Sequence, residues 1–352
     1  MKGLRLAYVL RVFPKLSETF IVGELAELRR RDVDVRILSL DRPQESLRHR
    51  AVAEAGLDSL TTFEIDRFAE ELGRFRPTVV HAHFATEPTA FARGIAAARG
   101  VPFTFTAHGY DVYRRPPADF HARARDAAGV VTVSEANARH IRDAFGVPSE
   151  RLRVIPCGID LARFSPGCSP DPRLVLAVAR LNPVKRLDVL LDACAILRDR
   201  GVSFRCVVIG DGPCRAELEQ QLRALALDRH VTLAGAREQT EVAAWWKRAG
   251  IAVLSSEREG MPVCLMEAAA SGVPAVAPAV GGIPELVEDG VTGLLVREGD
   301  PVALAGALAR LLRDPAHARE LGRAARTRAE HRFSVSTQVD GLVGLWQEVL
   351  AA

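Results

Sequence analysis

The sequence predicts an α/β fold made of two doubly wound, mostly parallel β-sheet domains. Short apolar runs of strand length alternate with longer segments of helical periodicity along most of the chain. Such alternation is typical of βαβ units. It stops in the Ser-, Pro- and Gly-rich segment 165–173 and then starts again. The 352 residues, 48% of them hydrophobic, are enough for two domains of ordinary size.

The first half supplies the elements of a predicted domain at residues 1–165. Strand-like runs are expected at 4–10, 34–40, 78–84, 102–108, 129–134 and the start of 152–164. Segments with apolar residues at helical spacing lie between them, at 18–31, 66–75, 91–100 and 135–146. A Rossmann-like arrangement follows from this order.

The second half repeats the alternation and predicts a second Rossmann-like domain at residues 166–330. Strands are expected at 174–180, 204–210, 230–235, 251–256, 274–279 and 292–296. Helices are expected at 186–201, 214–227, 241–250, 265–272 and 301–314. The last segment, 331–352, has a helical pattern beyond the second set of strands.

Charge and composition exclude several classes of protein. A net charge of +3 is too small to predict a nucleic-acid partner. No apolar stretch approaches the roughly 20 residues of a membrane span, and the amino terminus does not resemble an export signal. The six cysteines are scattered without a C-x-x-C spacing, as in a reducing compartment. We expect a cytoplasmic protein, and the basic bias of its first half leaves peripheral contact with the inner membrane face open.

In open α/β sheets, ligands bind beyond the carboxyl ends of the strands. Residues that directly follow strand-like runs are therefore the first candidates for chemistry. They are His81, His83, His108, Arg180 to Lys185, Gly210 to Gly212, and Glu259.

The segment 257–287 places acidic residues around the start of a predicted helix. Pro262 suits the first helical position, which would leave the amides of Gly260 and Met261 free for phosphate or sugar oxygens. Glu259 lies just before this helix end. Glu267 falls inside an otherwise apolar helix, where a buried carboxylate needs a partner. We expect the two acids to hold two parts of one extended ligand.

Two cations follow the first strand of the second domain. Arg180 ends the strand, and Lys185 stands near the next helix in a chain that otherwise uses mostly arginine. A guanidinium and an ammonium together suit a phosphate group. Gly210 and Gly212, in the sequence VVIGDGP, are weaker candidates, because a lone G-x-G also fits a tight turn. A nicotinamide-binding fingerprint is missing after the first strand.

The remaining candidates are the histidines and one spacing typical of metal ligands, Asp32-x-Asp34. His108 follows a strand and could meet a sugar hydroxyl, or support positive charge through its carbonyl. His81 and His83 share one side of a strand, but no third ligand is evident, so we expect a structural role. Asp32-x-Asp34 lies between a helix and a strand, away from the expected site. We predict no metal.

These stretches together resemble retaining glycosyltransferases of family 4, which have the GT-B fold. The segment EREGMPVCLMEAAASGVPAVAPAVGGIPELVEDGVTGLLV resembles the family's E-x7-E signature, and VARLNPVKRLDVLLDA, VVIGDGP, VIPCGIDLARF and TAHGYD resemble its other blocks. The opening LRVFPKLSETFIVGEL, with VVHAHFA, is similar to the branch that builds exopolysaccharides such as colanic acid. The resemblance covers nearly the whole chain.

The resemblance implies two Rossmann-like domains facing a cleft, with a nucleotide-sugar donor in the second. Arg180 and Lys185 would neutralise the leaving diphosphate. Glu259 would bind sugar hydroxyls, aided by the Gly260 and Met261 amides, and Glu267 would bind the ribose. His108 would lie near the anomeric carbon, Glu285 is a weaker candidate, and the terminal helix would cross back to the first domain. The implied reaction retains the anomeric configuration and needs no metal or other cofactor.

Some features depart from the resemblance or leave alternatives open. Many relatives have a glycine pair in the first strand–helix loop, where this chain has Lys15, Ser17 and Glu18, so Lys15 is a weak candidate only. The acceptor, a glycan or a lipid-linked glycan, is not specified by these residues. A sugar-nucleotide epimerase or isomerase of similar architecture, and an inactive nucleotide-sugar-binding protein, remain alternatives.

Overall fold

The computed structural model describes residues 3–45, 47 and 49–352. It divides into two compact units. Unit 1 contains residues up to Gly158 together with the terminal segment Val335–Ala352, and unit 2 is Ile159–Ser334.

Unit 1 is built around a fully parallel seven-stranded sheet with the order β3-β2-β1-β4-β5-β6-β7. Its strands are β1 (Arg5–Val12), β2 (Asp34–Asp41), β3 (Thr61–Thr62), β4 (Val79–His83), β5 (Phe103–Ala107), β6 (Gly129–Thr132) and β7 (Leu152–Val154). Its helices are α1 (Thr19–Arg30), α2 (Arg50–Glu54), α3 (Ile65–Phe75), α4 (Glu87–Arg99), α5 (Phe120–Asp126), α6 (Glu135–Phe145) and α14 (Val335–Ala351).

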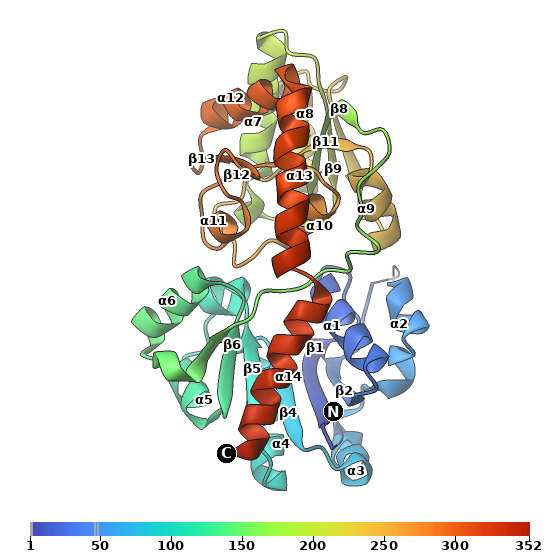
Figure 1. The fold of residues 1–352 in the computed structure, drawn as a ribbon, viewed down its shortest axis with the longest axis vertical. Helices are drawn as coiled ribbons and strands as arrows, with labels where there is room; N and C mark the ends of the chain where they lie inside the picture. Colours follow the sequence, from blue (N-terminus) through green and yellow to red (C-terminus); the bar gives the residue numbers. More distant parts are fainter. Residues whose placement is uncertain (1–2, 46, 48) are drawn as a thin grey trace. The chain divides into compact units, whose positions relative to one another are not determined.

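Both faces of this sheet are covered, as the near-continuous apolar strands require. Leu6, Tyr8 and Leu10 of β1 pack in one hydrophobic cluster with side chains of α1, α2 and α14. Ala7 and Val9, which point to the opposite face, pack in a second cluster with α3, α4, α5 and α6. The terminal helix α14 runs along the first of these faces (Figure 1).

Unit 2 has a fully parallel six-stranded sheet with the order β10-β9-β8-β11-β12-β13. The strands are β8 (Asp171–Val178), β9 (Arg205–Ile209), β10 (Val231–Gly235), β11 (Ala249–Val253), β12 (Ala275–Pro278) and β13 (Gly293–Val296). The helices are α7 (Leu187–Asp199), α8 (Arg215–Ala224), α9 (Gln239–Trp246), α10 (Val263–Ala270), α11 (Ile283–Leu286), α12 (Pro301–Arg313) and α13 (Pro315–Arg332). Helices α7, α8 and α12 supply much of its main core.

The strand order creates a switch point in each unit, where a ligand crevice is expected in doubly wound sheets. In unit 2 the chain moves outward from β8 to β9 and β10, then returns to the other side of β8 with β11. The loops after β8 and β11 therefore leave neighbouring strands in opposite directions. Arg180 and Lys185 follow β8, and Glu259 follows β11.

The α/β class with two parallel-sheet Rossmann-like units is confirmed. The unit boundary falls between Gly158 and Ile159, before the Ser- and Pro-rich segment expected to mark it. Sequence periodicity missed α2, α5, α11 and β3 because they are short, and α13 because its face toward the protein consists largely of alanine.

Candidate functional site

The Arg180 loop is positioned by the backbone of the neighbouring glycine loop. The N–H of Ala179 donates to the carbonyl of Ile209, and the N–H of Leu181 donates to that of Asp211. A Cβ on Gly210 would lie 1.9 Å from the Ala179 carbonyl oxygen, and Gly210 has φ +140°. The G-x-G segment therefore allows two loops to approach closely. Gly210 and Gly212 therefore support the Arg180 loop, and their contact with a phosphate stays a prediction.

Lys185 ends a short 3₁₀ turn, Pro183–Lys185, whose backbone is tied to the loop after β11. The Ser255 hydroxyl donates to the Lys185 carbonyl at 2.8 Å, and the N–H of Glu257 donates to the Val184 carbonyl at 2.9 Å. These contacts join the two loops that leave the switch point. They bring a cation and an acid that are far apart in the sequence to one place.

The Lys185 ammonium donates to Glu259 Oε1 at 2.5 Å, and both side chains are largely buried. Burial by itself lowers the pKa of Lys185, but the nearby Glu259 carboxylate more than offsets this effect and the pKa is raised. The ammonium is therefore charged and paired. The sequence predicts that the two residues bind different parts of one donor, and the structure also joins them to each other.

Arg180 remains as a cation without an ion pair among the described residues. Arg180 is exposed, and it lies close enough to Lys185 for its positive charge to oppose the rise of the Lys185 pKa. Since Lys185 and Glu259 neutralise each other, the positive charge of this loop pair comes from Arg180. A diphosphate would find its unpaired counter-ion there.

The Glu259 backbone is held by the glycine pair of the VGGIP segment. The N–H of Gly282 donates to the Glu259 carbonyl at 3.2 Å. A Cβ on Gly281 would lie 1.8 Å from that same oxygen, and Gly281 has φ +53°. Sequence reasoning missed this support, although two adjacent glycines after a strand were the available signal. Glu285 lies in the four-residue helix α11 and has further interactions.

The start of α10 differs from the prediction. Pro262 has φ −75° and ψ 110° and is the N-cap residue, so the helix begins at Val263 and not at the proline. Its carbonyl accepts from the N–H groups of Leu265 and Met266. No described residue accepts a hydrogen bond from the N–H of Gly260 or Met261. The expected pair of available amides thus lies two and three residues before the first helical residue, Val263.

Glu267 is buried on α10 and has protein partners. Trp246 Nε1 donates to Glu267 Oε2 at 3.3 Å. The Gln239 side chain also bonds to the carboxyl group, while its own oxygen accepts from Arg163 at 2.5 Å. Burial raises the pKa of Glu267 to about 7, although these hydrogen bonds and the charge of Arg163 oppose the shift. At neutral pH both protonation states are therefore populated.

Cys264 lies near three of the predicted site residues. Burial raises the pKa of its thiol to about 12; Lys185 lowers it, and Glu259 and Glu267 raise it further. The partly exposed Cys264 therefore lies close enough to Lys185, Glu259 and Glu267 for their charges to act on its thiol. The charge of Arg180 in turn acts on Lys185. The four residues expected to bind one ligand are gathered at the carboxyl end of the unit 2 sheet.

In unit 1, His108 follows β5 and enters a π-helical turn, Tyr110–Arg114. Both its N–H and that of Ala85 donate to the buried carboxyl group of Asp111, at 2.9 and 2.6 Å. Burial raises the pKa of Asp111 to about 7, against the effect of these two donors. The His108 carbonyl accepts from Val112, so one of its lone pairs is used within the turn. The side chain also uses one of its two nitrogens, because Nε2 lies 3.0 Å from Nδ1 of His83.

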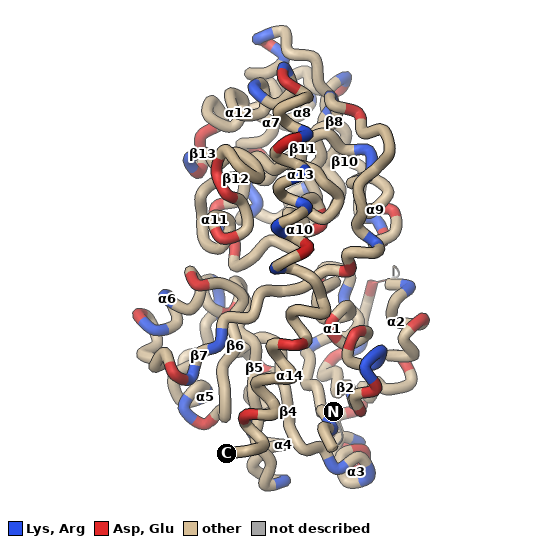
Figure 2. Tube along the Cα trace, in the orientation of Figure 1, with Lys and Arg blue, Asp and Glu red and all other residues tan. Residues whose placement is uncertain are grey.

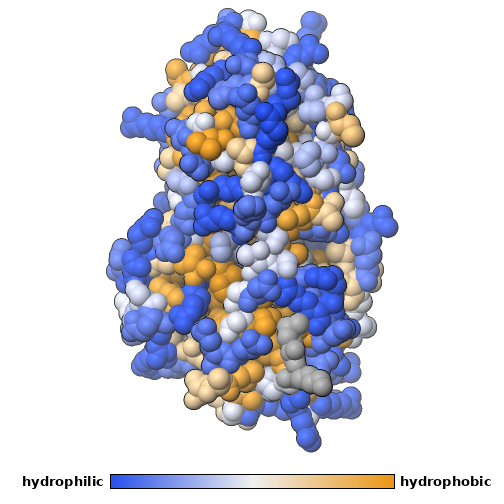
Figure 3. Space-filling view, in the orientation of Figure 1, coloured by the Kyte–Doolittle hydropathy of each residue, from blue (hydrophilic) through white to orange (hydrophobic). Residues whose placement is uncertain are grey.

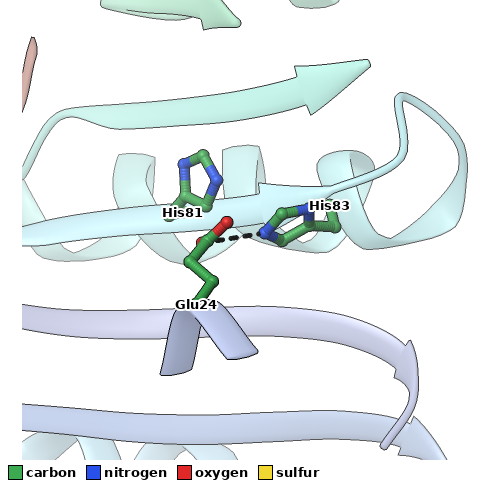
Figure 4. Close-up of side chains that lie close together, drawn as sticks. All are labelled: Glu24, His81 and His83. Atoms are coloured by element: carbon green, nitrogen blue, oxygen red, sulfur yellow. Dashed lines mark hydrogen bonds and ion pairs between the residues drawn. The ribbon is translucent and has the colours of Figure 1, made fainter. Parts of the chain in front are cut away.

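The expectation that His81 and His83 lack a third metal-binding partner was wrong, because Glu24 of α1 reaches them. The ligand atoms of these three residues lie within 4.8 Å of one another. Figure 4 shows Glu24 facing His83, whose Nε2 lies 3.1 Å from Glu24 Oε1. Both nitrogens of His81 bond to threonine hydroxyls, Thr104 and Thr106. With these nitrogens engaged in hydrogen bonds, the donor set fits a hydrogen-bond network better than a cation.

Lys15 is separate from these groups. Its ammonium donates to Glu18 at 2.6 Å within the same loop, which follows β1. The two residues that replace a glycine pair therefore bind each other, which gives no support for a ligand contact.

Charges and apolar side chains on the surface are mixed. Figure 2 shows Lys and Arg interspersed with Asp and Glu along both units. Hydrophobic areas interrupt the hydrophilic surface on the face drawn in Figure 3. The exposed large hydrophobic residues are scattered along the chain: Leu47, Ile65, Phe91, Tyr110, Val291, Val302 and Leu350. No helix in the described part of the chain has both the length and the apolarity to cross a membrane.

Two family models match the chain. The model described as "Glycosyltransferase Family 4" matches residues 17–163, and that described as "Glycosyl transferases group 1" matches residues 159–328. The second segment contains Arg180, Lys185, Glu259 and Glu267.

Similar proteins agree with these models. The putative colanic acid biosynthesis glycosyltransferase WcaL of Escherichia coli is 29% identical over 393 residues, covering 94% of this chain and 96% of its own. The amylovoran biosynthesis glycosyltransferase AmsK of Erwinia amylovora is 37% identical over 205 residues, covering 56% of this chain and 50% of its own. The structure of Anabaena Alr3699/HepE in complex with UDP-glucose has a TM-score of 0.81 at 18% identity, covering 98% of this chain and 100% of its own.

The fold likeness to HepE and the two parallel-sheet units identify the architecture as GT-B. No finding favours an epimerase, an isomerase or an inactive binding protein. Because the two matched segments together span residues 17–328, the chain belongs to the family 4 glycosyltransferases and carries a group 1 glycosyl transferase domain in its second unit.

Proposed function

We propose that this glycosyltransferase moves a sugar from a nucleotide-sugar donor to a glycan or lipid-linked acceptor during synthesis of an exopolysaccharide or another cell-surface polysaccharide. The relatives named for colanic acid and amylovoran biosynthesis support the pathway class. The HepE complexes with UDP and with UDP-glucose support the donor class, because that protein has the same fold.

One observation carries the donor assignment: the Lys185–Glu259 ion pair stands beside Arg180, and the amides of Gly260 and Met261 follow it in the chain. Within the described residues, Arg180 has no ion pair and the two amides have no acceptor. We assign the diphosphate to Arg180, with Lys185 adding charge at close range. Glu259, held by Lys185, accepts from hydroxyls of the donor sugar, and the two amides donate to sugar or phosphate oxygens. Glu267 accepts from the ribose hydroxyls.

The reaction we propose breaks the bond between the anomeric carbon and the diphosphate and forms a bond to an acceptor oxygen, with retention of configuration. Charge develops on the leaving diphosphate, and fixed positive groups that stabilise it supply most of the rate. Positioning of the two substrates supplies the rest. We assign to His108 a contact with a substrate hydroxyl, and we expect activity without an added metal. Such an enzyme would act in the cytoplasm, at or near the inner face of the membrane.

Calorimetry with UDP-, GDP- and ADP-sugars tests the donor assignment. We expect one nucleotide class to bind, and Lys185→Ala and Glu267→Ala each to weaken binding or turnover at least tenfold, since each removes a buried charged contact worth about 1–3 kcal/mol. Lys247→Ala is the matched control, because Lys247 is exposed in the same unit.

Equal binding by the wild type and both variants would contradict the site, and absence of any nucleotide-sugar binding would contradict the function. NMR of the product formed with EDTA present would report the anomeric configuration and any need for a metal.

A further inference from the structure

Unit 1 contains a buried chain of three ionisable side chains, which we call the Glu24–His83–His108 relay. His83 Nε2 lies 3.1 Å from Glu24 Oε1, and His83 Nδ1 lies 3.0 Å from His108 Nε2. Glu24 and His83 are fully buried, and His108 is 7% exposed. The three residues come from α1, the end of β4 and the end of β5. The chain thus runs from the protein interior to a side chain that reaches the surface.

The direction of the hydrogen bonds can be derived from Gln338 of α14. The backbone N–H of Gly158 can only donate, and it donates to Gln338 Oε1 at 2.7 Å. The amide nitrogen of Gln338 therefore faces Glu24 Oε2 and donates to it at 2.6 Å. The Tyr8 hydroxyl donates to Glu24 Oε1 at 2.6 Å. Both oxygens of Glu24 thus accept a hydrogen bond, Oε1 from Tyr8 and Oε2 from Gln338.

The protons on the two histidines follow from this arrangement. Because Glu24 accepts, His83 carries its proton on Nε2. A His83 ring that carries only this proton accepts at Nδ1, and His108 then donates to it from Nε2. Burial is the largest cause that holds the pKa of His108 well below its usual value, so its ring is neutral. Its Nδ1 is consequently unprotonated.

No residue in the described part of the chain makes a hydrogen bond with Nδ1 of His108. The rings of Phe20 and Phe84 flank the imidazole, with centroids 4.8 and 4.6 Å away. The backbone beside it is clamped by Asp111. These contacts fix the position of the imidazole. Nδ1 is then its one nitrogen without a hydrogen bond among the described residues.

We propose that Glu24 and His83 are positioning residues, which hold His108 as the Nε2–H tautomer so that its Nδ1 accepts a hydrogen bond from a substrate hydroxyl. The role of the relay rests on the proposed transferase function, whereas the tautomer itself does not. A hydroxyl is the fitting partner, because it can donate to a neutral nitrogen where a carbonyl or phosphate oxygen cannot.

His81 offers a matched control. It lies two residues before His83 on β4 and is also fully buried, but its nitrogens bond to Thr104 and Thr106 and not to the relay. Replacing His83 by Gln keeps an amide nitrogen that can donate to Glu24 from the former Nε2 position, and it leaves no acceptor at the former Nδ1 position, where His108 donates. Replacing His81 by Gln leaves the Nδ1 acceptor of His83 in place.

NMR of the full chain with ¹⁵N-labelled histidine tests the tautomer, because protonated and unprotonated ring nitrogens have very different shifts. The His108 signals are assigned as those lost in His108→Gln. We expect an Nε2–H tautomer in the wild type and in His81→Gln, and a mixture of both tautomers in His83→Gln. In the transfer assay, we expect His83→Gln to lower kcat at least tenfold with little change in donor affinity, and His81→Gln to change kcat less than threefold.

Three results would overturn the relay: an Nδ1–H tautomer in the wild type, no change of the His108 signals in His83→Gln, or the same change in His81→Gln. A change of the wild-type spectrum on treatment with EDTA would overturn it too, since Glu24, His81 and His83 would then hold a cation. If the wild type transfers no sugar while the tautomers are as expected, the proposed function fails and the tautomer assignment stands.

Discussion

Two cations of one loop, Arg180 and Lys185, differ in what neutralises them. Lys185 is buried and bonded to Glu259, while Arg180 is exposed and has no ion pair among the described residues. Nearby Arg186 is also exposed in part, but it is paired with Asp188 at 2.9 Å. An incoming diphosphate would therefore meet Arg180 as the available charge.

We expect Arg180→Ala to weaken donor binding by about 10- to 100-fold, because a charge-assisted hydrogen bond contributes about 1.5–3 kcal/mol. Arg186→Ala should change it less than threefold, since Arg186 already has a partner. Calorimetric titration of both variants at the same salt concentration makes the comparison. Equal losses would mean that only the general positive potential of the loop matters.

At the ribose position proposed for it, Glu267 is expected to couple donor binding to proton release. Its pKa of about 7 means that about half of the free enzyme is protonated there at pH 7. Ribose hydroxyls that donate to the carboxylate favour its charged form. We expect binding to release up to about half a proton at pH 7, seen by calorimetry in buffers with different ionisation enthalpies.

Glu267→Gln should remove this buffer dependence, and a dependence that persists would assign the proton to another group. The sign for stability follows from the same pKa. Because the folded pKa is raised above the ordinary 4.5, the folded state binds more protons between pH 4.5 and about 7. The contribution of Glu267 to stability is therefore present below this window and is lost as the pH rises through it.

The loops of unit 2 depend on glycines where backbones touch. Gly281 approaches the Glu259 carbonyl so closely that no side chain fits, and it also has a left-handed φ. Gly290 has a left-handed φ as well, of +72°, but a Cβ there would meet no atom within 4 Å. Comparing the two separates the close approach from the backbone conformation.

We expect Gly281→Ala to lower the free energy of unfolding by about 2–4 kcal/mol, from conformational strain together with overpacking. Gly290→Ala should cost about 1–2 kcal/mol, from strain alone. Chemical denaturation gives both values, and donor titration should show weaker binding for Gly281→Ala only. Similar stability losses would indicate that the VGGIP backbone moves aside without disturbing Glu259.

Helix α14 belongs to unit 1 although it is the last element of the chain. Trp346 is fully buried against the unit 1 sheet, and its Nε1 donates to Thr104 at 3.0 Å. Trp246 is equally buried in unit 2 and donates to Glu267. Each unit thus has one large buried tryptophan with a hydrogen-bonded indole.

We expect Trp346→Ala to destabilise unit 1, including residues 3–158, by about 3–5 kcal/mol. Trp246→Ala should destabilise unit 2 by a similar amount. Hydrogen exchange measured by mass spectrometry locates each effect in the chain. If Trp346→Ala accelerated exchange mainly in residues 159–334, the assignment of α14 to unit 1 would be wrong.

The sequence by itself determined the fold class, the two successive sheets and the acids and cations after β8 and β11. Local periodicity and turn residues specify these features, because each is set by a few neighbouring residues. The sequence also contained an indication of Glu24, because it is an acid among the apolar positions Ile21, Leu25 and Leu28 on one helix face. The predictions made no use of it. Only the tertiary structure decided which residues contact one another. The Lys185–Glu259 pair, the glycine contact at Glu259 and the Gln338–Glu24 bond join residues 74, 22 and 314 positions apart. Such pairings depend on strand order and loop direction, which no local pattern encodes.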